Sequence, residues 1–210
     1  MSMFVGNNLI KYLKWYIIIS DPVPHPKMKT ALLLIITVIV LMWFPWFVAT
    51  VIYASFLEWN LHKHLMHTKR KWFSYPFDTH AVIHHQIFRA DETYHLQHEE
   101  DKHTIPMAWW NGIVLVTIAT IPAIIIGYFQ SDIFIPIQTS IVVGLYYGTY
   151  EYFHWCMHLP KERWFEKTTW YKNLKERHRL HHLKMGTTNF NVVLPVADLW
   201  YGTYEAPSIA

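Results

Sequence analysis

The sequence predicts an all-α integral membrane protein in which transmembrane helical hairpins carry a cytoplasmic helical cap with a histidine-rich metal site. Two observations lead to this prediction. The chain has 210 residues, of which 52% are hydrophobic, and the apolar side chains are concentrated in long blocks. Ten of the 15 histidines lie in tight groups just outside those blocks. We expect two regions: residues 1–30, an N-terminal interfacial segment and linker, and residues 31–210, one membrane domain.

The first region is predicted to lie at the membrane surface. Lys11 and Lys14 interrupt a modest apolar stretch that no small-residue cleavage pattern follows, so we expect a short amphipathic helix rather than a signal peptide. The prolines at positions 22, 24 and 26 predict a rigid, non-helical linker.

The first apolar block, residues 31–57, has no charged side chain and exceeds the roughly 20 residues that a membrane-spanning helix needs. Pro45 lies near its middle, so the block is either one kinked span or a hairpin that turns at Pro45. Lys27 and Lys29 favour the hairpin, although each arm would be shorter than the hydrocarbon layer. We favour the hairpin, with its second arm running on towards His67. The sequence leaves open whether the chain crosses the membrane three or four times.

The second apolar block, residues 107–150, predicts another hairpin. Its one charge, Asp132, lies where a turn is expected, in Gln130-Ser131-Asp132. Aromatic residues near the block edges are typical of membrane interfaces. All 18 Lys and Arg lie outside the two blocks, and by the positive-inside tendency residues 60–106 and 154–184 face the cytoplasm. A soluble helical protein is disfavoured because its helices need a polar outer face.

The grouped histidines are candidate metal ligands, because imidazole is the commonest protein metal ligand. Residues three or four apart lie on one face of a helix, so each of three sets could point into a common cavity: His80 with His84, His154 with His158, and His178 with His181 and His182. His62 and His67 are five apart, about 140° around an α-helix, so they could bind different metals or the helix could unwind between them. The ten candidates are His62, His67, His80, His84, His85, His154, His158, His178, His181 and His182.

Other residue types limit what this site can be. Haem ligation and metal transport are disfavoured because the apolar blocks contain no histidine. Cys156 is the single cysteine, so the ligands are nitrogen and perhaps oxygen. We expect Glu58 and Glu151 to accept hydrogen bonds from His62 and His154, with Asp78 and Asp198 as weaker candidates; an equally favoured alternative makes Glu58 and Glu151 plain interfacial carboxylates.

Two further segments surround the histidine groups. A helix is expected from about Phe77 through His85, followed by a solvated connector in which His95, His98 and His103 lie among carboxylates. His64 is an extra candidate ligand within the first group. Residues 161–184 predict a basic amphipathic helix along the membrane surface.

The motifs at residues 58–67, 80–85, 151–158 and 174–182, with the tail at 189–203, resemble the histidine boxes of the fatty acid hydroxylase and sterol desaturase superfamily. The resemblance covers roughly residues 55–203. It implies a membrane oxygenase whose dimetal site holds two iron ions, with zinc able to substitute in a preparation, and which uses O2 to hydroxylate or desaturate a lipid. Three residues separate His80 from His84 where many relatives have two, which makes His80 the least secure ligand.

The expected partners are a lipid substrate, O2 and a separate electron donor, with no nucleic acid. The chain has no cytochrome b5 pattern and no Gly-rich dinucleotide fingerprint, so a ferredoxin or a cytochrome b5-like protein would dock on the basic residues 161–184. Two alternatives remain open: a carotenoid hydroxylase of the same chemistry, and a non-catalytic membrane protein that the metal stabilises. Hydroxylation and desaturation share the first hydrogen abstraction, so the sequence does not separate them.

Overall fold

The computed structural model describes residues 26–207, and the regular elements of this part of the chain are all helices, without strands. Its contacts divide the chain into two units, residues 1–45 and 46–210. The predicted interfacial helix lies outside the described residues, as does the linker up to residue 25.

Helix α2 (Pro26–Leu61) is continuous through Pro45. The expected hairpin turn at Pro45 is therefore wrong. A proline inside a helix removes one backbone hydrogen bond, whereas a turn in an apolar block would leave several backbone groups without partners.

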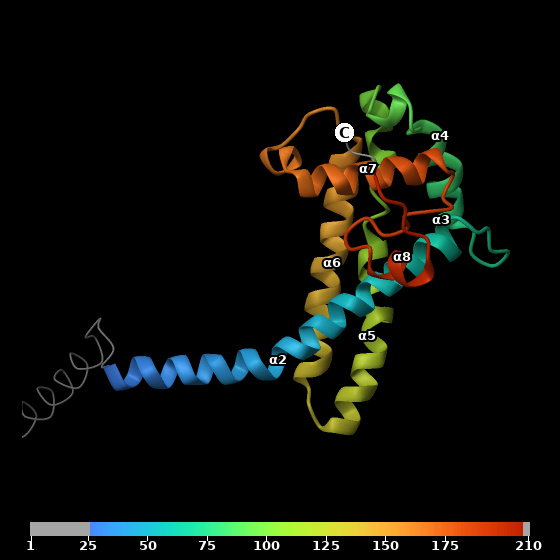
Figure 1. The fold of residues 1–210 in the computed structure, drawn as a ribbon. Coiled ribbons are helices and arrows are strands. Elements are labelled where there is room, and N and C mark those ends of the chain that lie inside the picture. The colour runs from blue at the N-terminus through green and yellow to red at the C-terminus, as the bar shows by residue number, and fades with distance from the viewer. Residues whose placement is uncertain (1–25, 208–210) are drawn as a thin grey trace, which may run out of the picture. The chain divides into compact units, whose positions relative to one another are not determined.

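Helices α5 (Trp110–Gln130) and α6 (Phe134–His158) form the predicted second hairpin and lie side by side (Figure 1). Ser131 adopts a left-handed conformation with φ 54°, and the Asp132 carboxylate accepts a 2.8 Å hydrogen bond from the N–H of Phe134. Gly127 is needed here, because a Cβ would lie 2.7 Å from the carbonyl oxygen of Asp132. Among the described residues, α5 is the one helix long and apolar enough to cross a membrane.

The second half of α2 packs against this hairpin. Trp46 donates a 3.0 Å hydrogen bond from Nε1 to Thr139 on α6, and the Tyr53 hydroxyl donates one of 3.2 Å to the carbonyl of Ala119 on α5. Residues 46–61 of α2 therefore belong to the same unit as α5 and α6.

The cap lies at the end of the hairpin where α5 begins and α6 ends (Figure 1). It consists of short elements: the π-helices η1 (His62–Met66) and η2 (Asp78–His84), the 3₁₀ turns η3 (Glu92–Tyr94), η4 (Glu99–Thr104) and η5 (Trp164–Lys167), and the α-helices α3 (Tyr75–Phe77), α4 (His85–Ile87), α7 (Thr169–Leu183) and α8 (Val196–Tyr201).

Two predictions about the cap need correction. The basic helix begins at Thr169 rather than residue 161, because the Thr168 hydroxyl caps it by accepting a hydrogen bond from the N–H of Tyr171. The connector after residue 89 is only partly solvated, since Tyr94 and Leu96 are buried. The N–H of Leu96 donates a 2.7 Å hydrogen bond to the carbonyl of His158, which holds the connector against the end of α6.

Candidate metal centre

Two π-helices align histidines that are five residues apart. The N–H of His67 donates a 3.0 Å hydrogen bond to the carbonyl of His62, and the N–H of His85 donates one to that of His80. This wider turn places residues i and i+5 on one face, where an α-helix would separate them by about 140°. The ring centroids of His62 and His67 are 5.1 Å apart. Of the two possibilities that the sequence left open, the helix unwinds between the two histidines.

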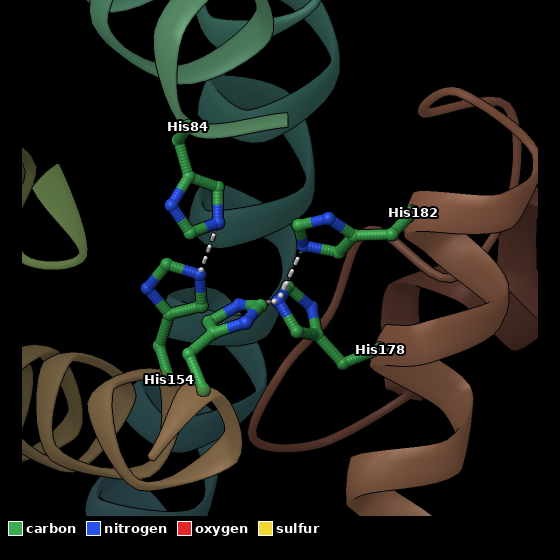
Figure 2. A group of neighbouring side chains, drawn as sticks. His84, His154, His178 and His182 are labelled. Atoms are coloured by element: carbon green, nitrogen blue, oxygen red, sulfur yellow. Dashed lines mark hydrogen bonds between the residues drawn. The ribbon is translucent and has the colours of Figure 1, made fainter. Parts of the chain in front are cut away.

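Nine of the ten candidate histidines form two groups, and within each group the potential ligand atoms lie within 4.8 Å of one another. All are buried except His67, which is partly exposed. Figure 2 shows four members of the larger group pointing towards one another from η2, α6 and α7. The five-histidine group is His84, His154, His158, His178 and His182, and the four-histidine group is His62, His67, His80 and His181. His80, the doubtful ligand, lies within the second group.

His85, the tenth candidate, lies between the groups. Its Nε2 is 3.2 Å from Nε2 of His80 in the four-histidine group, and its ring stacks on His182 of the five-histidine group with centroids 4.0 Å apart. Its Nδ1 is buried without a hydrogen-bond partner. His85 thus contacts both groups.

Backbone carbonyls determine which nitrogen faces each group. A carbonyl oxygen can only accept, so a ring bonded to one carries its proton on Nδ1 and has an unprotonated Nε2. Five rings are held in this way: His62 by Phe190 at 2.5 Å, His84 by Thr104 at 3.3 Å, His158 by Tyr94 at 2.9 Å, His181 by Thr188 at 2.7 Å and His182 by Phe88 at 2.5 Å. Their free Nε2 lone pairs all point into the two groups.

The spacing of those Nε2 atoms fits a bound cation. The unprotonated Nε2 atoms of His158 and His182 lie 3.1 Å and 3.0 Å from Nε2 of His178. A single proton on Nε2 of His178 could form a hydrogen bond with only one of these two atoms. In the four-histidine group, Nε2 of His181 is 2.9 Å from that of His67. Nitrogen ligands at right angles on a metal with bonds of about 2.1 Å lie about 3.0 Å apart. Metal ions would replace repulsion between lone pairs with coordination.

Burial keeps these rings in the protonation state that binds metal. It lowers the pKa of His62 to about 4 and that of His158 to about 3. Desolvation also lowers the pKa of His181 and His182 well below the ordinary value. The imidazoles are therefore neutral at pH 7, with lone pairs available for coordination.

The two glutamates do not make the predicted hydrogen bonds to histidine. Glu58 instead accepts from the Tyr146 hydroxyl at 2.7 Å, the Asn191 amide at 3.0 Å and the N–H of Val192 at 2.6 Å. The proton on Nδ1 of His62 goes to the carbonyl of Phe190, a segment that only the tertiary fold brings there. Glu58 thus ties α2 to α6 and to the C-terminal segment.

Glu151 likewise forms hydrogen bonds with residues other than His154. It accepts a 2.5 Å hydrogen bond from the Tyr147 hydroxyl and one of 3.3 Å from the N–H of Met107. Of the weaker candidates, Asp78 lies 4.0 Å from Lys69 in an ion pair outside both groups. Glu151 therefore bonds to its own helix α6 and to the segment before α5, and not to His154.

Asp198 acts on the site through the backbone. Its carboxylate accepts hydrogen bonds from the N–H groups of Phe190 at 2.9 Å and Asn191 at 2.8 Å, and from the Thr203 hydroxyl at 2.7 Å. These bonds fix the Phe190 peptide, whose carbonyl orients His62. Sequence analysis missed this role because backbone carbonyls carry no sequence signal.

The remaining candidates lie outside both groups. His98 and His103 are exposed and His95 is partly exposed, in agreement with solvated side chains. Exposed His64 packs edge-on against Trp59, with centroids 5.7 Å apart. The structure therefore brings together the ten predicted ligands and separates them from these four histidines.

Comparison with known families is consistent with this arrangement. The model of a family described as fatty acid hydroxylase matches residues 47–203, which is more than half of the chain. The chain belongs to the fatty acid hydroxylase family. The predicted resemblance to the fatty acid hydroxylase and sterol desaturase superfamily is thus confirmed, and both histidine groups of this family member lie inside the matched region. No curated protein and no solved structure matches the chain.

Proposed function

We propose that this member of the fatty acid hydroxylase family is a membrane-bound, O2-dependent di-iron enzyme that hydroxylates or desaturates a lipid. The observation that carries the proposal is the convergence of neutral imidazole Nε2 atoms in two adjacent buried groups. Each group would hold one iron ion, and zinc could take the same nitrogen ligands in a preparation. When bound, the two ions would supply the dioxygen activation that an unactivated C–H bond requires.

The chain's own residues would hold and shield this centre. Carbonyls from the connector and the C-terminal segment orient five rings, and His85 separates the two groups. Burial of the rings excludes water from the metal-binding nitrogens. Such rigid support keeps metal ligands in the geometry that catalysis needs.

A lipid substrate is supported by two neighbouring apolar cavities, one of which borders the four-histidine group. The narrower, about 60 Å³, is lined by His62, Glu58 and Tyr146 together with apolar side chains. The wider, about 180 Å³, lies between α2 and the start of α5. Both are lined by Leu57, Leu61, Met66, Leu115 and Tyr147, so an acyl or isoprenoid chain could pass from one to the other.

We further propose an integral membrane location with the histidine centre on the cytoplasmic face. The apolar helix α5 and the clustering of basic residues in the cap support this orientation. A separate ferredoxin or cytochrome b5-like donor would dock on the basic residues of 161–184, which include the outer side chains of α7. Turnover with purified donor should therefore slow at high salt.

The decisive experiment is comparative lipid mass spectrometry of cells that express the wild-type chain or His181→Ala. A product with one added oxygen atom would indicate hydroxylation, and a product lacking two hydrogen atoms would indicate desaturation. His103→Ala, an exposed histidine outside both groups, is the matched control and should retain the product.

The non-catalytic alternative is tested with the purified iron form. Oxygen-dependent oxidation of an added reductant, coupled to lipid product, supports the enzyme. Tight iron binding with no oxygen consumption in the presence of lipids and donor would instead favour a structural metal centre.

A further inference from the structure

The wider cavity contains one polar group that has no partner in the protein. Asn111 lies in the first turn of α5 and lines the cavity among apolar side chains. Its backbone N–H donates to the carbonyl of Ala108 at 2.9 Å, but its side-chain Nδ2 is buried without a hydrogen-bond partner. A buried donor without an acceptor is costly, so such a group in a binding cavity points to an acceptor on the ligand.

Several other polar side chains of the two cavities already have partners. The Tyr147 hydroxyl donates to Glu151, and Glu58 accepts hydrogen bonds from Tyr146 and Asn191. Both ring nitrogens of His62 are also in contact, with the Phe190 carbonyl and with His80. Among the described residues that line these cavities, Asn111 has the buried side-chain nitrogen that lacks a partner.

We propose that Asn111 is a specificity-determining residue that donates a hydrogen bond from Nδ2 to an oxygen atom of the lipid substrate. The inference rests on the proposed function, since it takes these cavities as the substrate site. Leu115, one helical turn or about 6 Å further along α5, lines both cavities. The lipid oxygen would lie at Asn111 and its chain would pass Leu115 towards His62.

This arrangement selects among the lipid classes that the sequence left open. An acyl carbonyl and a lipid hydroxyl both offer an acceptor to the amide. A pure hydrocarbon such as an unoxygenated carotenoid offers none and would bury the amide unpaired. Asn111 therefore favours an oxygen-bearing lipid over the hydrocarbon alternative.

The test is an equilibrium binding assay with the full-length, iron-loaded protein in detergent micelles. The probes are a fatty acid methyl ester, a fatty alcohol and an alkane of the same chain length. The wild type should bind the ester or the alcohol about three- to tenfold more tightly than the alkane, as expected for one hydrogen bond. Whichever of the two binds more tightly identifies the source of the oxygen as carbonyl or hydroxyl.

Asn111→Leu removes the amide at similar volume and should abolish this preference, leaving alkane binding unchanged or tighter. Ile118→Val, which alters an apolar side chain of the same cavity, should keep it. If Asn111→Leu does not fold, Asn111→Ala also removes the donor without adding a charge and should lose the preference. A wild type without preference, or a folded Asn111→Leu or Asn111→Ala that retains it, overturns the inference.

The binding assay separates this inference from the proposed function because it needs no turnover. His181→Ala should lose the lipid product and keep the binding preference. A preference in a wild type that never oxidises lipid would contradict the proposed function alone. Lipid oxidation without any preference would contradict the role of Asn111 alone.

Discussion

The two histidine groups use the same ligand type but differ in support and exposure. The five-histidine group is fully buried, and its supporting carbonyls, from Phe88, Tyr94 and Thr104, all belong to the connector between α4 and α5. The four-histidine group takes its carbonyls from Thr188 and Phe190, and its member His62 lines a cavity. A metal ion in one group would therefore differ from an ion in the other in its rate of release and in its distance from the substrate, although every ligand is an imidazole.

The largest expected effect comes from removing one ligand of each group. His158→Ala and His181→Ala should each lower the iron content from two ions per chain to one and abolish turnover, because each deletes an Nε2 atom of a different group. Elemental analysis of the purified variants measures the loss. If either variant loses both ions, the two groups form one cooperative site and do not bind their ions independently.

Gly186→Ala should weaken the four-histidine group selectively. Gly186 adopts φ +71°, and a Cβ there would overlap the ring of His67. The substitution is therefore expected to lower metal affinity by about 10- to 100-fold at that group and to leave the other ion in place. Gly202→Ala has the same kind of conformation, φ +67°, but open space around it, so it controls for backbone strain.

Asp198→Asn should act more mildly on the same group. The loss of carboxylate charge weakens the hydrogen bonds that hold the Phe190 peptide and thus the orientation of His62. We expect about a tenfold loss of affinity for the second iron ion, measured by titration of the metal-free protein. An unchanged second affinity would show that Phe190 is positioned without Asp198. Glu100→Gln, at an exposed position, should have no effect.

Chelation should remove the two ions in a fixed order. His67 is partly exposed, whereas every ligand of the five-histidine group is buried. A chelator is therefore expected to release the first ion severalfold faster than the second, with the first taken from the four-histidine group. Repeating the time course with Gly186→Ala should accelerate only the fast phase; equal rates for both ions would remove this distinction.

Acidification should destabilise the metal-free protein. In the unfolded chain the histidines have a pKa of about 6.5 and bind protons more readily than the buried rings of the folded chain. The folded state is therefore fully stable above pH 6.5, and its stability falls as the pH drops below that value. The loss extends to about pH 4 for His62 and about pH 3 for His158. Thermal unfolding followed by tryptophan fluorescence measures it. Stability that rises between pH 6.5 and 4 would contradict neutral buried rings.

Helical spacing predicted much of this centre because α6 and α7 are regular helices. His154 with His158, and His178 with His182, share faces as expected. The same argument failed for His80 with His84 and for His178 with His181, which lie in different groups. It left two outcomes open for His62 and His67, because π-helical hydrogen bonding leaves no clear trace in a sequence. The argument also failed for Glu58, whose carboxylate accepts a hydrogen bond from the N–H of Val192 instead of from His62.

By itself, the sequence determined that the chain is helical, that its second apolar block is a hairpin with a turn near Asp132, and which ten histidines come together. These features follow from local periodicity, turn chemistry and residue type, all of which are local properties of the chain. Only the tertiary structure decided how the ligands divide into two groups, that α2 continues through Pro45, and that carbonyls rather than Glu58 or Glu151 orient the rings. The grouping of the ligands and the orientation of the rings depend on contacts between distant segments, such as Phe190 with His62, where any residue type offers the same backbone oxygen.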